Sequence, residues 1–350
     1  MYLRNPQLAT SKILVNSISC KLQQIINYTR GFSASAFSPV GRKVVFGYDD
    51  GTIRIFDCVT KSETLTPKTD VRSIRAVTFS PDGQRFAVKR CLASEARPRP
   101  SVNGPGHYLQ LLEIETLAVI WDVKTEDLDR IAFSPTGDTI ACRERYGYVY
   151  LFRAATGQRF HKLSNNELLS GPLEFSPDGL SILVAESDIM FRPSTLKILD
   201  AGTGRNLARV NYHSPALERF PSERAIRAGF LPDGQSVWFC SSERVELWDL
   251  RTNTSSELIR FPNTNNSMIP MVAASPDGCS FAWCDRYPLA PNILHIYHVN
   301  LAAGNVVQRT MVNLKHNAQT IAVSCDGRHI MSVGVNYVYM WDVKVEWKRD

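Results

Sequence analysis

The hydrophobic pattern of the chain repeats seven times. Each copy has an apolar residue followed by Ser or Leu, usually Pro, then usually a polar residue, and finally Gly. The apolar residues that lead the copies are Phe37, Phe79, Phe133, Phe175, Phe230, Ala274 and Val323, at steps of 42, 54, 42, 55, 44 and 49 residues. A period of about 40–45 residues, lengthened by insertions, is typical of a propeller built from four-stranded blades.

Each Gly of the repeat predicts the turn of a β-hairpin. Pro sets φ at the first corner, Asp bonds back to its own backbone, and Gly adopts the positive φ that closes the turn. Apolar runs flank the turn, as in Ala76–Phe79 and Arg85–Val88, and they predict the first two strands of a blade, a and b. A second apolar run in each copy, such as Val245–Asp249, predicts strand c, and several copies then carry a Thr-Gly turn into strand d.

These phrases resemble the repeats of the WD-repeat (WD40) family, and the pairs Trp248-Asp249 and Trp341-Asp342 carry the likeness most directly. The resemblance extends from about residue 22 to the end of the chain. It implies an all-β, seven-bladed β-propeller of four-stranded antiparallel blades. Trp121-Asp122 lies too close to Phe133 for strand c, so we assign Leu109–Glu113 to strand c of blade 2 and Trp121-Asp122 to strand d.

The repeats span the chain without a linker, which predicts one domain over residues 1–350. The last copy ends nine residues after Trp341, too soon for a strand d of its own. We therefore expect residues 18–36 to supply a closing strand and its lead-in, with 18–26 pairing with strand c of blade 7. Residues 13–15 are a rival, because they align with a strand c position. Residues 1–17 are expected to form a tail or cap.

The charge of the chain is uneven. The net charge is +6, and residues 1–48 contain six basic residues and no acidic one, so the remainder is balanced. This balance argues against a general nucleic-acid surface, which needs a basic patch. The acid-free start leaves a mitochondrial transit peptide as an alternative, although the ring needs part of this segment.

The cysteines and the apolar runs indicate the compartment. No apolar run approaches the ~18 residues that a membrane span requires. The eight cysteines are scattered and form no Cys-x-x-Cys pair. They predict reduced thiols in a cytoplasmic or nuclear protein.

The insertions of the repeat map to one face of the expected ring. Blades 2, 4 and 6 are lengthened between strands b and c, and the connection from blade 4 to blade 5 is lengthened between strands d and a. In a repeat ring, insertions gathered on one face usually mark the binding face. Arg and aromatic residues are common interface anchors, and on these loops they are Arg97, Arg99, Arg192, Tyr212, His213, Arg286 and Tyr287.

The pattern favours a non-catalytic protein-interaction scaffold. It would bind a protein or peptide, acidic or phosphorylated, through the long-loop face and the central opening; the competing interpretation is a set of solvated loops without a partner. The sequence contains no nucleophile elbow, phosphate loop or metal-ligand spacing. We therefore predict no enzyme, no cofactor and no metal. A propeller enzyme remains an alternative, because catalytic residues from different blades could converge in space.

A second alternative is a substrate receptor of a cullin-RING ubiquitin ligase. The string Trp248-Asp249-Leu250-Arg251 resembles the box by which some WD-repeat proteins dock on the adaptor of these ligases. The resemblance implies that Arg251 would carry the contact with the adaptor, while the long loops would hold the substrate.

Overall fold

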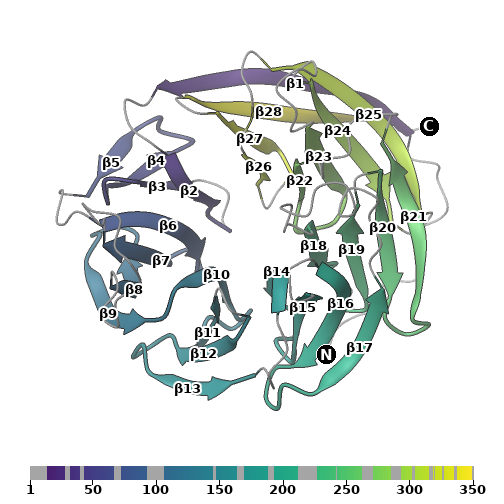
Figure 1. Ribbon diagram of the computed structural model, residues 1–350. Helices are drawn as coiled ribbons and strands as arrows, with labels where there is room; N and C mark the ends of the chain where they lie inside the picture. Colours follow the sequence, from purple (N-terminus) through teal and green to yellow (C-terminus); the bar gives the residue numbers. More distant parts are fainter. Residues whose placement is uncertain are drawn as a thin grey trace, which may run out of the picture.

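The protein is a ring of seven β-sheets in a computed structural model (Figure 1). The structure describes residues 14–27, 32–39, 43–66, 72–92, 106–144, 147–163, 169–187, 193–211, 227–241, 243–261, 271–284, 293–301, 304–314, 318, 320–324, 327–334 and 337–348. Each sheet has four antiparallel strands, and the sheets are arranged as blades around a central axis. The all-β seven-bladed propeller predicted from the repeats is confirmed.

Six blades follow the order of the chain, with the first strand innermost and the fourth outermost (Figure 1). Blades 1 to 3 comprise β2 (Phe32–Phe37), β3 (Lys43–Tyr48), β4 (Ile53–Asp57) and β5 (Glu63–Leu65); β6 (Arg72–Phe79), β7 (Arg85–Leu92), β8 (His107–Glu113) and β9 (Val119–Thr125); and β10 (Leu128–Phe133), β11 (Thr139–Glu144), β12 (Val149–Arg153) and β13 (Arg159–Lys162). Blades 4 to 6 comprise β14 (Leu169–Phe175), β15 (Ser181–Ser187), β16 (Pro193–Asp200) and β17 (Asn206–Asn211); β18 (Arg227–Phe230), β19 (Ser236–Cys240), β20 (Arg244–Asp249) and β21 (Thr254–Arg260); and β22 (Met271–Ala274), β23 (Ser280–Cys284), β24 (Ile293–Asn300) and β25 (Asn305–Asn313).

Blade 7 joins the two ends of the described chain. It combines β26 (Thr320–Val323), β27 (His329–Val333) and β28 (Tyr337–Lys348) with β1 (Leu14–Asn27). The antiparallel pairing of β1 with β28 runs from Leu14 opposite Lys348 to Asn27 opposite Tyr337. The closing strand is thus longer than residues 18–26, because β28 continues for 12 residues and offers a partner along its whole length.

The turn chemistry follows the repeat. Every leading residue of a copy is the last residue of an innermost strand. In the six copies whose Gly the structure describes, that Gly has a φ between 65° and 75°, which confirms the predicted left-handed closure of the turn. Trp121 and Asp122 lie on the outermost strand β9, whereas 109–113 belong to β8, as the alignment of the copies predicts.

The Ser of each phrase holds the hairpin together. Ser80 is fully buried, and its hydroxyl accepts a hydrogen bond from the Arg85 N–H at 3.0 Å while it donates to the Asp82 carboxylate. Ser176 and Ser275 repeat both bonds with the residues five and two positions further on. A buried hydroxyl therefore locks the first corner of the hairpin to the start of the second strand.

The blades adhere through apolar cores. Within the described residues, seven clusters of buried side chains form, one at each junction between neighbouring blades. At the junction that closes the ring, Val44 and Phe46 of blade 1 pack with Met331 and Met340 of blade 7. Apolar packing therefore connects neighbouring blades at each of these junctions.

Blades 2 and 4 add ion pairs of buried lysines to this apolar packing. The buried Lys89 contacts Asp127, and the buried Lys197 lies 2.8 Å from Glu186; both carboxylates are partly exposed. A charge of this kind is tolerated in a core only when it is paired. Paired charges therefore add to the apolar packing of these two blades.

Candidate binding site in the central channel

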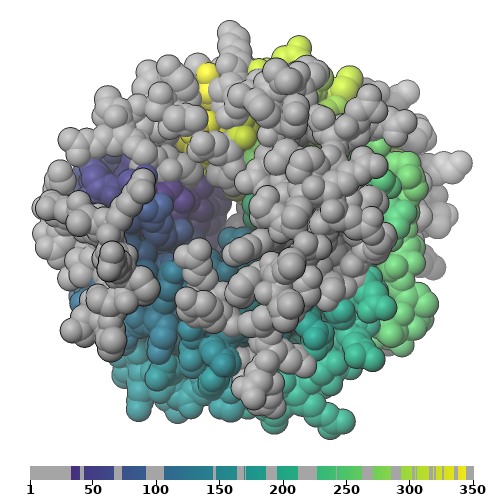
Figure 2. Space-filling model, viewed as in Figure 1, coloured from purple at the N-terminus to yellow at the C-terminus, as the bar shows by residue number. Residues whose placement is uncertain are grey.

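The innermost strands of blades 3 to 7 enclose a cavity of about 330 Å³. In the space-filling view the surface is hollowed near the middle of the ring (Figure 2). The lining residues are Arg130, Gly171, Pro172, Leu173, Glu174, Arg227, Ala228, Trp238, Val272, Ala273, Ala274, Ile321, Ala322 and Val323. A concave wall that combines apolar residues with a few charged groups is a common composition of a binding site.

The two arginines of the cavity occupy the same level of the channel. Arg227 is the first residue of β18 and Arg130 is the third residue of β10, so each lies three residues before the last residue of its strand. The cavity also reaches Ala274 and Val323, the last residues of β22 and β26. The arginines therefore face the middle of the channel.

Arg143 connects the two parts of the cavity wall that blades 3 and 4 form. The pairing of β10 with β11 shifts between Leu128 and Arg130, and this β-bulge contains Asp129. Arg143 on β11 donates to both oxygens of the Asp129 carboxylate, at 2.9 and 2.7 Å, and to the carbonyl oxygens of Gly171 and Pro172 at 2.8 and 3.2 Å. Its side chain is only 3% exposed. Arg143 therefore fastens the inner strand of blade 3 to that of blade 4.

The surroundings of Arg130 destabilise its positive charge. Burial, followed by the like charges of Arg227 and Arg143, lowers the pKa of Arg130 to about 10, although Asp129 opposes the shift. The guanidinium stays protonated at neutral pH and is reachable by solvent in the channel. Two like charges and one carboxylate act on it, so an anion that enters the cavity would relieve the repulsion.

The carboxyl group of Glu174 is a mostly uncharged part of the cavity wall. Burial raises the pKa of its carboxyl to about 8, although the Phe230 N–H donates a hydrogen bond to it. A Cβ at Gly229 would lie 2.8 Å from Glu174 Oε2 and 2.8 Å from Trp238 Nε1, so only glycine lets both side chains approach here. Because Glu174 is mostly protonated at pH 7, it competes little with an anionic ligand for the arginines.

Eight residues are predicted from the sequence to bind a partner. Seven of them lie outside the described residues, namely Arg97, Arg99, Arg192, Tyr212, His213, Arg286 and Tyr287.

The eighth, Arg251, lies in the turn between β20 and β21, on the opposite face of the ring from the long loops. Its side chain is 70% exposed, and its Nη2 lies 3.3 Å from Asp249 Oδ2.

The channel residues are not among those predicted from the sequence, which lie on the insertions and on the Trp-Asp-Leu-Arg string. Arg130 and Arg227 belong to innermost strands, where most side chains are apolar or small. Each lies three residues before the leading Phe of its copy, and a charged residue at that position of an innermost strand is the signal that points to them.

The channel and the seven blades define the class of protein, a β-propeller with a central cavity whose charged wall includes two arginines. The family model described as "WD domain, G-beta repeat" matches residues 21–57, which include β2, β3 and β4. This match, together with the seven four-stranded antiparallel blades, supports a WD-repeat family for the chain. Propellers of this family are typically protein-interaction scaffolds and are generally non-catalytic.

Two solved structures resemble the whole ring. The chain is similar to a chain in a crystal structure of the mitotic checkpoint complex, with a TM-score of 0.69, 12% identity, and 98% of each chain covered. It is also similar to the β-propeller domain of Cps50 (Swd1) from Myceliophteria thermophila, with a TM-score of 0.71, 14% identity, and 93% of this chain and 100% of that chain covered. No curated protein matches the sequence. At these identities the likeness shows the fold alone.

Proposed function

We propose that the protein is a non-catalytic interaction scaffold that binds an acidic peptide segment in its central channel. Arg130 and Arg227 would pair with the carboxylates of this segment, and the apolar wall would receive its uncharged side chains. The observation that carries the proposal is the convergence of two arginines on one cavity of about 330 Å³. The bidentate contact of Arg143 with Asp129 fixes the strand that bears Arg130.

The chemistry of the channel favours a negatively charged ligand. Guanidinium groups in a partly enclosed site give strong, directional hydrogen bonds to carboxylates. The repulsion from Arg227 and Arg143 that lowers the pKa of Arg130 would weaken when an acidic side chain enters. A largely protonated Glu174 leaves the anionic position open to the partner.

The test is a peptide-display selection on the immobilised full chain. Enriched peptides would be synthesised, and their dissociation constants measured by fluorescence anisotropy against the wild type and the double variant Arg130→Glu/Arg227→Glu. Breaking hydrogen-bonded charge pairs in an enclosed site costs about 2–5 kcal/mol, so we expect binding to weaken by about 30-fold or more. The wild type should enrich peptides rich in Asp and Glu.

Arg153→Glu is the matched control for this test. Arg153 ends β12 in blade 3, the blade of Arg130, but it is exposed at the face of the ring opposite the long loops. This variant should bind the selected peptides as the wild type does. Equal affinity of the wild type and the double variant would contradict the channel as the binding site. A further variant in which Arg97, Arg99, Arg192 and Arg286 are all changed to Glu tests the contribution of the long loops.

A second candidate function is the ubiquitin-ligase substrate receptor, and the position of Arg251 favours it. The side chain is 70% exposed on the face opposite the long loops, so an adaptor and a substrate could bind at the same time. Co-purification of the ligase adaptor should be lost in Arg251→Ala. It should persist in Arg205→Ala, which removes an exposed arginine from the corresponding turn of blade 4. Retention of the adaptor by both variants would exclude this role for Arg251.

A further inference from the structure

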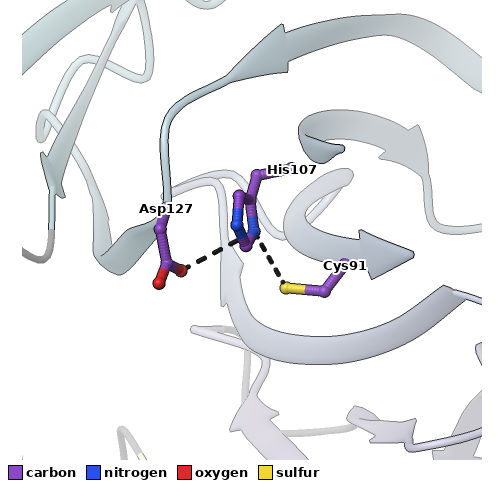
Figure 3. A group of neighbouring side chains, drawn as sticks. All are labelled: Cys91, His107 and Asp127. Carbon is purple, nitrogen blue, oxygen red and sulfur yellow. Dashed lines mark hydrogen bonds and ion pairs between the residues drawn. The ribbon is translucent and has the colours of Figure 1, made fainter. Parts of the chain in front are cut away.

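Three side chains with metal-binding chemistry meet beside blade 2. Cys91 Sγ lies 3.2 Å from His107 Nδ1, and His107 Nδ1 lies 3.6 Å from Asp127 Oδ1 (Figure 3). The three ligand atoms lie within 4.8 Å of one another. All three residues are partly buried, and the exposed fractions of the His107 and Asp127 side chains are 21% and 29%.

The fold places these residues by pairing rather than by sequence spacing. Cys91 near the end of β7 lies directly opposite His107, the first residue of β8. Asp127 follows β9 and directly precedes β10, so it belongs to the connection from blade 2 to blade 3. The cluster therefore joins the two ends of the connection from β7 to β8 with the start of the next blade.

The arrangement around the imidazole distinguishes a metal site from a nucleophilic triad. In a triad, the nucleophile and the carboxylate use different nitrogens of the histidine, because the ring passes a proton between them. Here both Cys91 Sγ and Asp127 Oδ1 face the same nitrogen, Nδ1. Three donors that converge on one small volume are suited to sharing a cation.

We propose that Cys91, His107 and Asp127 form a zinc-binding site on the long-loop face of the ring. Zinc accepts sulfur, imidazole nitrogen and carboxylate oxygen in tetrahedral geometry at about 2.0–2.3 Å. Ions with these bond lengths separate their ligand atoms by about 3–4 Å, which matches the 3.2 and 3.6 Å observed here. Three protein ligands leave one position of the tetrahedron for water. The ion would replace the thiol proton of Cys91, and that proton would leave to solvent.

The positively charged Lys89 lies next to the proposed zinc ligands. The ammonium of the buried Lys89 contacts the Asp127 carboxylate. It holds the carboxylate in place in the absence of metal. When zinc binds, the thiolate of Cys91 and the carboxylate of Asp127 balance the two charges of the ion, and Lys89 becomes a partner of the bound cluster.

The test uses the untagged full chain and two metals. Zinc affinity would be measured by competition with a chromophoric chelator, and cobalt substitution would be followed by absorption, since a thiolate ligand gives a charge-transfer band in the near ultraviolet. We expect one ion per chain and a thiolate band for the wild type. Cys91→Ala should lose the band, and His107→Ala and Asp127→Asn should each weaken binding by more than the roughly 10–100-fold that loss of an outer-shell partner costs.

Cys279→Ala is the control. Cys279 is a partly buried thiol in the turn of blade 6, and its sulfur contacts the Asp277 carbonyl rather than a histidine. This variant should bind both metals as the wild type does. The proposal is overturned if the wild type binds no ion at micromolar free zinc, or if Cys91→Ala retains the wild-type affinity. Matching circular dichroism spectra of all variants establish that lost binding is not lost folding.

Discussion

At the scale of single residues, two buried titratable side chains make the stability of the fold depend on pH in opposite directions. The raised pKa of Glu174, about 8, means that the folded state holds a proton that the unfolded state releases above about 4.5. Stability therefore falls as the pH rises through this window. Burial, followed by the charge of Arg309, lowers the pKa of His295 from 6.5 to about 4, so stability falls as the pH drops through that range. Of the two, only Glu174 titrates above pH 6.5.

Glu174→Gln should flatten the loss of stability between pH 4.5 and 8. At the lower pH the wild-type carboxyl is at least half protonated in the folded and unfolded states and resembles the amide, so the two proteins should have similar free energies of unfolding. As the pH rises through this window the wild type should lose up to about 1.4 kcal/mol per pH unit relative to the variant, and the difference should level off above pH 8. Urea unfolding at three pH values measures this difference. Glu115→Gln, at a side chain that is 67% exposed, should keep the wild-type slope; parallel slopes for wild type and Glu174→Gln would refute the assignment.

Lys89→Met should tighten zinc binding at the proposed site. The ammonium contacts Asp127 and repels an incoming cation, and a like charge a few ångströms away is worth more than about 1.4 kcal/mol at a partly buried site. We expect zinc affinity to rise by about 10-fold or more in the chelator competition. Lys61→Met, which removes an exposed lysine from a turn of blade 1, should leave it unchanged. Weaker binding in Lys89→Met would mean that the lysine mainly positions Asp127.

At the scale of elements, the first hairpins of blades 2, 4 and 6 each depend on one buried hydroxyl. In blade 5 the Ser is replaced by Leu231, and the hairpin uses Asp233 instead, which accepts from the Ser236 hydroxyl at 2.7 Å. The buried Leu231 then packs so close to the turn of blade 6 that a Cβ at Gly278 would lie 2.5 Å from it. The hydrogen bond from Ser236 to Asp233 therefore takes the place of the missing serine bond. Gly278, which has no side chain, leaves room for Leu231.

Ser275→Ala should show the cost of losing that hydroxyl in blade 6. The Ser280 N–H would lose its 2.9 Å acceptor in a buried place, and Asp277 would lose a donor. Leaving a buried donor unsatisfied costs about 1–3 kcal/mol, and we expect a decrease of that size in the free energy of unfolding by urea. Ser255→Ala, on the exposed part of β21, should change it by less than about 0.5 kcal/mol. A similar loss in both variants would show that the turn hydroxyl has no special role.

At the scale of the whole molecule, the sequence predicts the turns and strands that recur in each repeat. It does not predict which residues from distant parts of the chain meet in space. The turn glycines and the assignment of Trp121 to an outer strand follow from local chemistry and spacing, which recur in each copy. Arg130 and Arg227 are far apart in sequence, and only the curvature of the ring brings them to one cavity. Cys91 and His107 meet through strand register, which no ligand-spacing pattern encodes. Contacts between side chains of different strands or blades therefore become apparent only in the folded ring.

The closure of the ring gives the last prediction. Removing residues 1–27 deletes β1 and leaves the 12-residue β28 as an open edge, which invites pairing with other chains. Removing residues 1–13 leaves β1 whole and is the matched control. We expect the longer truncation to lower the midpoint of thermal unfolding and to form aggregates in size-exclusion chromatography with light scattering, while the shorter one behaves as the full chain. A monomeric longer truncation with an unchanged midpoint would show that blade 7 is stable with three strands, and that the apolar junction of blades 7 and 1 holds the ring by itself.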